Sequence, residues 1–141
     1  MSNYKPQVVE HLVRPYNVGE IGSPSGIGES GEATCGDVAR FTVRISKAYV
    51  EDARYKVYGC AASIAAGSAL SKMVRGRSLI EAAKVSKLDI ENALGGPLPV
   101  GKEHALVLVL DALHKAFEDY WNKEAGARLV EGYRGYEVSG E

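Results

Sequence analysis

The sequence predicts an α+β protein, on two observations about the spacing of its apolar residues. Val38 to Ile45 and Glu51 to Tyr58 each alternate between apolar and polar residues, a period typical of half-buried strands. From Lys102 to about Lys123, apolar residues recur instead at spacings of three and four, which indicates a long helix. We therefore expect a small antiparallel β-sheet packed by about five helices, with the long helix near the C-terminus.

The two alternating segments form a predicted antiparallel hairpin, because only the short link from Ser46 to Val50 joins them. Opposed residues share one face of a sheet, so odd-numbered positions pair with odd-numbered positions. If Ile45 lies opposite Glu51, then Phe41 meets Tyr55 in the apolar layer. A structure can check this register residue by residue.

The same register brings both cysteines of the chain to one end of the hairpin. Asp37 is expected to face Gly59, and Cys35 to face Ala61, next to Cys60. Two thiols that are distant in the sequence thus meet beside a carboxylate. This end of the hairpin is the candidate site.

Four further helices are predicted from periodicity, caps and breakers. Ser78 and Glu81 have the spacing of a capping box at the start of one of them. The four helices span Asn3 to Arg14, Cys60 to Val74, Ser78 to Val85, and about Leu88 to Leu94.

Two segments are interpreted as irregular. Ile21 to Thr34 is rich in glycine and serine, which predicts a loop with a short irregular strand around Gly26–Glu29. No Gly-Lys-Ser/Thr follows these glycines, so phosphate binding is disfavoured. The polar tail from Gly126 to Glu141 is expected either to fray or to add an edge strand through Arg128–Val130. The chain is therefore divided into a domain of residues 1–125 and a tail of residues 126–141.

The composition is ordinary for a globular protein. Of 141 residues, 45% are hydrophobic and 25% are charged, with a formal net charge of −1. This charge gives no reason to expect nucleic acid as a partner. No apolar run is long enough to span a bilayer and no signal sequence is recognisable, so we expect no membrane association and a cytoplasmic location. Paired cysteines in a reducing compartment more often bind metal or carry sulfur than form disulfides.

Two predicted helix N-termini each contribute a potential metal ligand to the candidate site. At a helix N-terminus, Cys60 would meet the positive end of the helix dipole and unpaired N–H groups, which favour the thiolate. His104 lies in the first turn of the long helix and can project towards the same rim. Together with Cys35 and Asp37, these residues form a ligand set that suits zinc, and thiolates also suit iron–sulfur clusters. The spacing alone leaves open that both cysteines are buried and inert.

A series of motifs, in a fixed order along the chain, carries a resemblance to a known family. The motifs are Arg14-Pro-Tyr-Asn-Val-Gly19, Cys35-Gly36-Asp37, Glu51-Asp-Ala-Arg-Tyr-Lys followed by Gly59-Cys60, Ser63-Ile-Ala65, Ser68, Met73-Val74, Gly76, Leu98-Pro99, Lys102-x-His104 and Asp111-Ala112. Together they resemble the iron–sulfur cluster scaffold family, of the NifU N-terminal or IscU type, over roughly residues 3–122. The ordered combination is far more specific than any one motif.

This resemblance implies a non-enzymatic scaffold on which a transient [2Fe–2S] cluster is assembled for apo iron–sulfur acceptor proteins. Cys35, Asp37, Cys60 and His104 would bind the cluster, and a cysteine desulfurase would supply sulfur. Zinc in the same site and a cluster shared between two subunits of a homodimer are alternatives. The N-terminal helix and the ligand-bearing rim would meet the desulfurase. The region around Leu98-Pro99-Val100 matches the family's chaperone-binding motif only in part, so chaperone dependence is not expected.

The chain departs from the family pattern at one position. The motif usually continues Lys-x-His-Cys, whereas Ala105 follows His104 here. The third cysteine is the usual sulfur acceptor and a cluster ligand in the family, so this chain offers two thiolates instead of three. An imidazole in place of a thiolate should raise the reduction potential of the cluster, as in Rieske centres, and weaken its retention.

Other functions remain open beside the scaffold. The chain is alternatively a zinc-bound relative that assembles no cluster, or a relay protein that carries a persulfide on Cys60. A hydrolytic zinc enzyme ranks last, because it needs three protein ligands, a bound water and a nearby base. No spare His or Glu is placed for that role.

Overall fold

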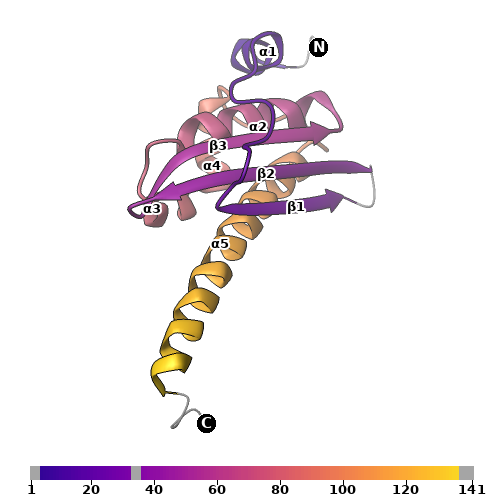
Figure 1. Ribbon diagram of the computed structural model, residues 1–141. Helices are drawn as coiled ribbons and strands as arrows, with labels where there is room; N and C mark the ends of the chain where they lie inside the picture. The colour runs from indigo at the N-terminus through magenta and orange to yellow at the C-terminus, as the bar shows by residue number, and fades with distance from the viewer. Residues whose placement is uncertain (1–3, 33–35, 137–141) are drawn as a thin grey trace.

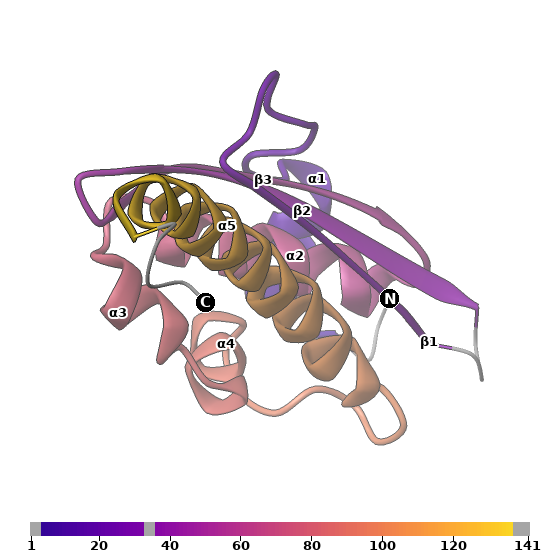
Figure 2. The same cartoon turned by 60° about the horizontal axis from the view of Figure 1, so that its bottom comes forward.

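The computed structural model describes residues 4–32 and 36–136, with the backbone alone at residue 32 and at residues 127–136. The structure has two layers, a sheet and a set of helices that cover one of its faces (Figures 1 and 2). The antiparallel sheet has the order β1-β2-β3, which confirms the predicted α+β class. The strands are β1 (Gly26–Glu32), β2 (Asp37–Ser46) and β3 (Tyr49–Tyr58).

The described residues form five helices. The two larger ones, α2 and α5, pack on the inner face of the sheet, and α1 packs against α2. The N-caps of α3 and α4 are Ser78, whose hydroxyl accepts from the Glu81 N–H, and Ser86, which forms a full capping box with Asp89. The helices are α1 (Pro6–Val13), α2 (Ala61–Val74), α3 (Leu79–Ala83), α4 (Lys87–Ala93) and α5 (His104–Tyr136). Among the described residues, none of them combines the length and apolar content needed to cross a bilayer.

The hairpin has the predicted register over most of its length. Phe41 pairs with Tyr55, and their ring centroids are 6.0 Å apart. The expected pairing of Ile45 with Glu51 is wrong, because Ile45 pairs with Val50 after a bulge. A two-residue turn causes this shift: Lys47 and Ala48 both have positive φ, at 52° and 66°, as a type I′ turn requires.

The glycine-rich segment contains a strand where the sequence predicted one, around Gly26–Glu29, but this strand, β1, is regular and seven residues long instead of short and irregular. Its glycines allow a close approach between the strand and α5. A Cβ on Gly28 would overlap the backbone of α5 at Ala112, and one on Gly26 would lie 3.1 Å from the N atom of Tyr120. The N–H of Ile27 also donates to the carboxylate of Asp119 on α5 at 2.9 Å. Glycine here serves packing, and not chain flexibility.

The segment between α1 and β1 crosses the outer face of the sheet (Figure 1). The N–H of Ile21 donates to Thr42 Oγ1 at 3.0 Å, and the N–H of Ser25 donates to the carbonyl of Val43 at 2.8 Å. This covering explains why Thr42, a polar residue on the outer face of β2, is only 1% exposed.

One hydrophobic core lies between the sheet and the helices. The Tyr55 ring packs over Gly67 of α2, where a Cβ would lie 2.7 Å from the ring. The many alanines of α2 have the same effect, because small side chains let the helix lie close to the sheet. The largest fully buried side chains are Tyr55, Phe41, Leu70, Ile90, Leu94, Leu106, Leu113, Val8, Val43, Val50, Val74 and Val109.

The C-terminal segment continues α5. The backbone is helical from His104 through Tyr136, so the alternative of an edge strand through Arg128–Val130 is wrong. Figure 1 shows the second half of α5 extending away from the sheet. The division at residue 125 remains a prediction, and residues 137–141 lie outside the described part.

We predict that Gly28→Ala destabilises the protein by about 3 kcal/mol, because the new methyl group overlaps the backbone of α5 and forces strand and helix apart. Gly31→Ala is the matched control in the same strand, since a Cβ there meets nothing nearer than the carbonyl oxygen of Asp37 at 3.9 Å. The control should change the free energy of unfolding by less than about 1 kcal/mol. Urea unfolding measures both, and equal losses would contradict the packing role of Gly28.

Candidate metal centre

Asp37 begins β2 and is the buried carboxylate of the site, with 5% of its surface exposed. Its side chain lies directly over Gly59, where a Cβ would be 2.7 Å from Asp37 Oδ2. Any larger residue at position 59 would displace the carboxylate. Gly59 is therefore part of the site, although it has no functional group.

Cys60 is the N-cap residue of α2, as expected from the strand-to-helix transition. Its own side chain does not cap the helix. The cap comes instead from β2, because Asp37 Oδ2 accepts from the Cys60 N–H at 3.3 Å and from the Ser63 hydroxyl at 2.8 Å. The carboxylate thus satisfies donors in the first turn of α2, where the helix dipole favours negative charge. Cys60 Sγ lies 3.4 Å from Ser63 Oγ and is half-buried.

His104 is the first residue of α5 and reaches the same point from the other helix. Its Nε2 atom lies 3.8 Å from Asp37 Oδ2, which is too far for a hydrogen bond. Nε2 is buried and has no hydrogen-bond partner in the described structure. An unpaired buried imidazole nitrogen is unfavourable by about 1–3 kcal/mol, and an electrophile at this point would remove that penalty.

The three side chains fit a metal ion. One ligand atom each from Asp37, Cys60 and His104 lies within 4.8 Å of the others. Ligand atoms around a tetrahedral zinc ion are about 3.3–3.8 Å apart, so a small inward movement would complete the contacts. Carboxylate oxygen, thiolate sulfur and imidazole nitrogen are all established ligands of zinc and iron.

The environment of Asp37 favours its charged form. Burial opposes ionisation, but the hydrogen bonds from the Ser63 hydroxyl and from Cys60, with the nearby His104, outweigh it and lower the pKa of Asp37 below its usual value. The site therefore offers a carboxylate anion at neutral pH. Within the described part of the chain, its charge is met by the hydrogen-bond donors of Ser63 and Cys60, and no lysine or arginine pairs with it.

The structure brings together three of the four predicted site residues. Asp37, Cys60 and His104 converge, whereas Cys35 lies outside the described residues, and its pairing with Ala61 stays a prediction. Sequence reasoning assigned no role to Ser63, the central donor of the site. Its spacing was the available signal, since a residue three positions after an N-cap faces the same side of the first turn.

The fold and the site together define a class: an α+β domain whose hairpin end presents a carboxylate, a thiol and an imidazole to one point. Within that class, the chain belongs to the family of the NifU-like N terminal domain, which matches residues 3–127.

Relatives of two kinds support this membership. A "Bifunctional protein NifU/MnmA" of Rubrobacter xylanophilus is 58% identical over 127 residues, which are 89% of this chain but 26% of that protein. The chain thus spans about a quarter of this relative. The "Iron-sulfur cluster assembly scaffold protein IscU" of Escherichia coli is 36% identical over 124 residues, 85% of this chain and 95% of that protein. The protein of the same kind named IscU 1 in Archaeoglobus fulgidus is 37% identical, over 85% of this chain and 78% of that protein.

Solved structures share the fold. A NifU-like protein (N-terminal) from Brucella abortus superposes with a TM-score of 0.68 at 18% identity, over 86% of this chain and 96% of that one. A SUF-system scaffold protein from Fervidobacterium islandicum gives 0.66 at 16% identity, over 82% and 96%. At these identities, the similarity concerns the fold alone.

We predict that Asp37→Asn lowers the stability of the metal-free protein at neutral pH but has little effect in acid. The folded-state pKa of Asp37 is below the ordinary value of 3.8, so its charge adds stability that is full above that pH and is lost as pH falls through the lowered pKa. Urea unfolding in chelator at pH 7 and at an acid pH well below 3.8 measures the difference between the two proteins. An equal difference at every pH would contradict a charge-dependent role.

Proposed function

We propose that this chain is a scaffold on which an iron–sulfur cluster is assembled and from which it is passed to acceptor proteins. The observation that carries the proposal is the convergence of Asp37, Cys60 and His104 on one point, with His104 Nε2 buried and unpaired. Membership of the NifU-like N terminal domain family supports it. The cluster is cargo of this protein, and the chain itself performs no catalysis.

The proposed ligands are Cys35, Asp37, Cys60 and His104, around a transient [2Fe–2S] cluster. Thiolates are the preferred ligands of iron–sulfur clusters, and an imidazole can replace one of them. Ala105 is fully buried and supplies no ligand. One thiolate fewer than the family pattern favours a labile cluster, which suits a protein that must release it. We propose that this takes place in the cytoplasm.

Zinc binding is the alternative that the same donor set supports. Thiolate, imidazole and carboxylate ligands suit a tetrahedral zinc ion. The two functions differ in whether iron and sulfide displace the ion. A sulfur relay differs from both, because it would leave a sulfur adduct on Cys60 without any iron.

We predict that anaerobic reconstitution with iron and sulfide gives the purified chain a visible charge-transfer absorption, and that His104→Ala loses most of it. Ala105→Cys should retain its cluster against a chelator about tenfold longer, since a third thiolate replaces weaker ligands. Absorption spectroscopy, with iron and sulfide analysis, measures both.

Two controls make this experiment decisive. Circular dichroism must show that Ala105→Cys is folded, because the new sulfur enters a fully buried position. Tightly bound zinc that iron and sulfide do not displace, with no visible absorption, would contradict the scaffold function. A sulfur adduct on Cys60 after incubation with a desulfurase alone would favour the relay.

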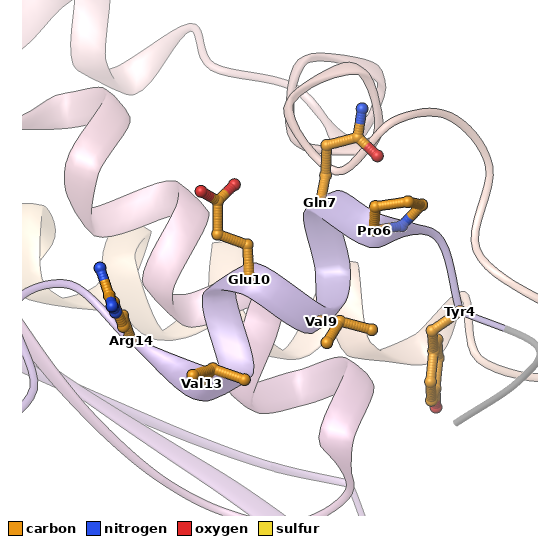
Figure 3. Close-up of a pocket in the computed structure, with 7 residues that line it drawn as sticks. All are labelled: Tyr4, Pro6, Gln7, Val9, Glu10, Val13 and Arg14. Carbon is orange, nitrogen blue, oxygen red and sulfur yellow. The ribbon is translucent and has the colours of Figure 1, made fainter.

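We propose that a cysteine desulfurase supplies sulfur and docks partly on the outer side of α1. A groove there is lined by Tyr4, Pro6, Gln7, Val9, Glu10, Val13 and Arg14 (Figure 3). Val13 is 70% exposed, and an exposed apolar side chain beside charged ones is common at protein interfaces. The acceptors proposed are apo iron–sulfur proteins. Because the Rubrobacter relative combines NifU with MnmA by name, a MnmA-type protein belongs among the acceptors to be tested.

We predict that Val13→Asp weakens binding of the desulfurase about tenfold, because it places a charge in an apolar contact. Ile80→Asp is the matched control, since Ile80 is similarly exposed, at 66%, but lies on α3. Biolayer interferometry with immobilised desulfurase measures both affinities. Equal affinities for Val13→Asp and the unmodified chain would remove α1 from the interface.

A further inference from the structure

We infer that Ser63 is a positioning residue that controls how tightly the site holds its metal, by sharing one hydroxyl proton between Asp37 and Cys60. The inference deepens the proposed scaffold function and rests on it. It concerns a residue that touches both ligands and is not itself among the proposed ligands.

Ser63 is placed to contact both ligands at once. It lies in the first turn of α2 and is fully buried. Its Oγ donates to Asp37 Oδ2 at 2.8 Å and lies 3.4 Å from Cys60 Sγ. A hydroxyl has one proton to donate, so it can serve Asp37 or Cys60 as a donor, but not both.

In the structure, this proton is committed to Asp37. Ser63 then has only lone pairs to offer Cys60, whose thiol can act as the donor in their contact. The Cys60 N–H is the second donor to Asp37 Oδ2. With two donors, Asp37 Oδ2 stays 3.8 Å from His104 Nε2. The carboxylate is thereby occupied as long as no metal is bound.

Metal binding changes which atom can accept the hydrogen bond of the Ser63 hydroxyl. When Cys60 binds as thiolate, its sulfur has no proton and becomes an acceptor. If Asp37 Oδ2 also binds the metal, it must give up the Ser63 hydrogen bond, and the freed hydroxyl can turn to the Cys60 sulfur. A hydrogen bond to a ligating sulfur weakens the sulfur as an electron donor and tunes the metal.

Ser63 opposes retention through Asp37. The hydroxyl stabilises the metal-free carboxylate by a hydrogen bond that the carboxylate must give up when it binds the metal. Removing the hydroxyl should therefore make Asp37 a freer ligand. A scaffold benefits from this arrangement, because the same hydroxyl that orders the empty site assists the departure of its cargo.

The test uses cobalt(II) as the probe, in the full chain after removal of other metals. We expect Ser63→Ala to bind cobalt about tenfold more tightly, the typical effect of one hydrogen bond to a charged group, and to release it to a chelator more slowly. The thiolate-to-cobalt charge-transfer band should move to lower energy, because the sulfur has lost a donor. Unchanged affinity and an unchanged band would overturn the inference.

Three further variants separate this role from a structural one. Ser71→Ala is the matched control, since Ser71 is also fully buried on α2 but bonds to backbone carbonyls away from the site. It should leave cobalt binding unchanged. Ser63→Thr keeps the hydroxyl and should restore the unmodified values. In an Asp37→Ala background, Ser63→Ala should lose most of its effect on affinity, and a full effect there would overturn the inference.

The cobalt experiment does not depend on cluster assembly. If the unmodified chain binds cobalt but never acquires a cluster, the proposed function fails while the role of Ser63 at the metal site is still measured. If the cluster forms but Ser63→Ala changes neither cobalt affinity nor cluster release, only this inference fails. Circular dichroism of each variant confirms that it is folded.

Discussion

The carboxylate of Asp37 at the start of α2 is the interaction on which the site depends. It joins the first residue of β2 to the first turn of α2 through the Cys60 N–H and the Ser63 hydroxyl. Helix N-termini have unpaired N–H groups, and a buried carboxylate needs hydrogen-bond donors. The contact between the two therefore satisfies both. The arrangement requires Gly59, because the carboxylate occupies the space of a side chain there. The position and the charge of the site thus follow from the capping of α2 by a carboxylate of β2.

The second constraint is the close approach of β1 to α5. Gly26 and Gly28 let the strand lie against the helix backbone, and Asp111 and Asp119 on the helix accept hydrogen bonds from that strand. This packing orients α5, and the first residue of α5 is His104. The imidazole therefore reaches the site because a glycine-rich strand holds the helix that carries it. The packing of β1 against α5 thus determines where His104 lies in the site.

Period-two alternation was enough to predict the hairpin, its Phe41–Tyr55 pair and the convergence of Asp37 with Cys60, because strand parity is a strict geometric rule. Parity could not predict the bulge before Ile45, since that shift arises from positive φ at Lys47 and Ala48, residues that rarely signal such a turn.

The length and regularity of β1 were underestimated for a related reason. Glycine normally indicates a loop, and only the three-dimensional neighbour α5 shows that Gly28 is a packing residue. Ser63 was also assigned no role, because its spacing of three positions from Cys60 is a weak signal in an alanine-rich helix. Its importance depends on Asp37, which is distant in the sequence.

The hydrogen bonds that hold the site together come from the chain itself. Ala105, the residue after His104, is fully buried among the apolar side chains of the core, so its methyl group contributes to packing. Asp37 accepts hydrogen bonds from Ser63 and Cys60, whereas the buried Nε2 of His104 has no hydrogen-bond partner among the described residues. A resident structural metal usually supplies folding free energy, and its removal unfolds the domain. Because Ser63 and Cys60 already supply hydrogen bonds to Asp37, we expect loading and release to proceed on a folded chain, as the proposed scaffold function requires.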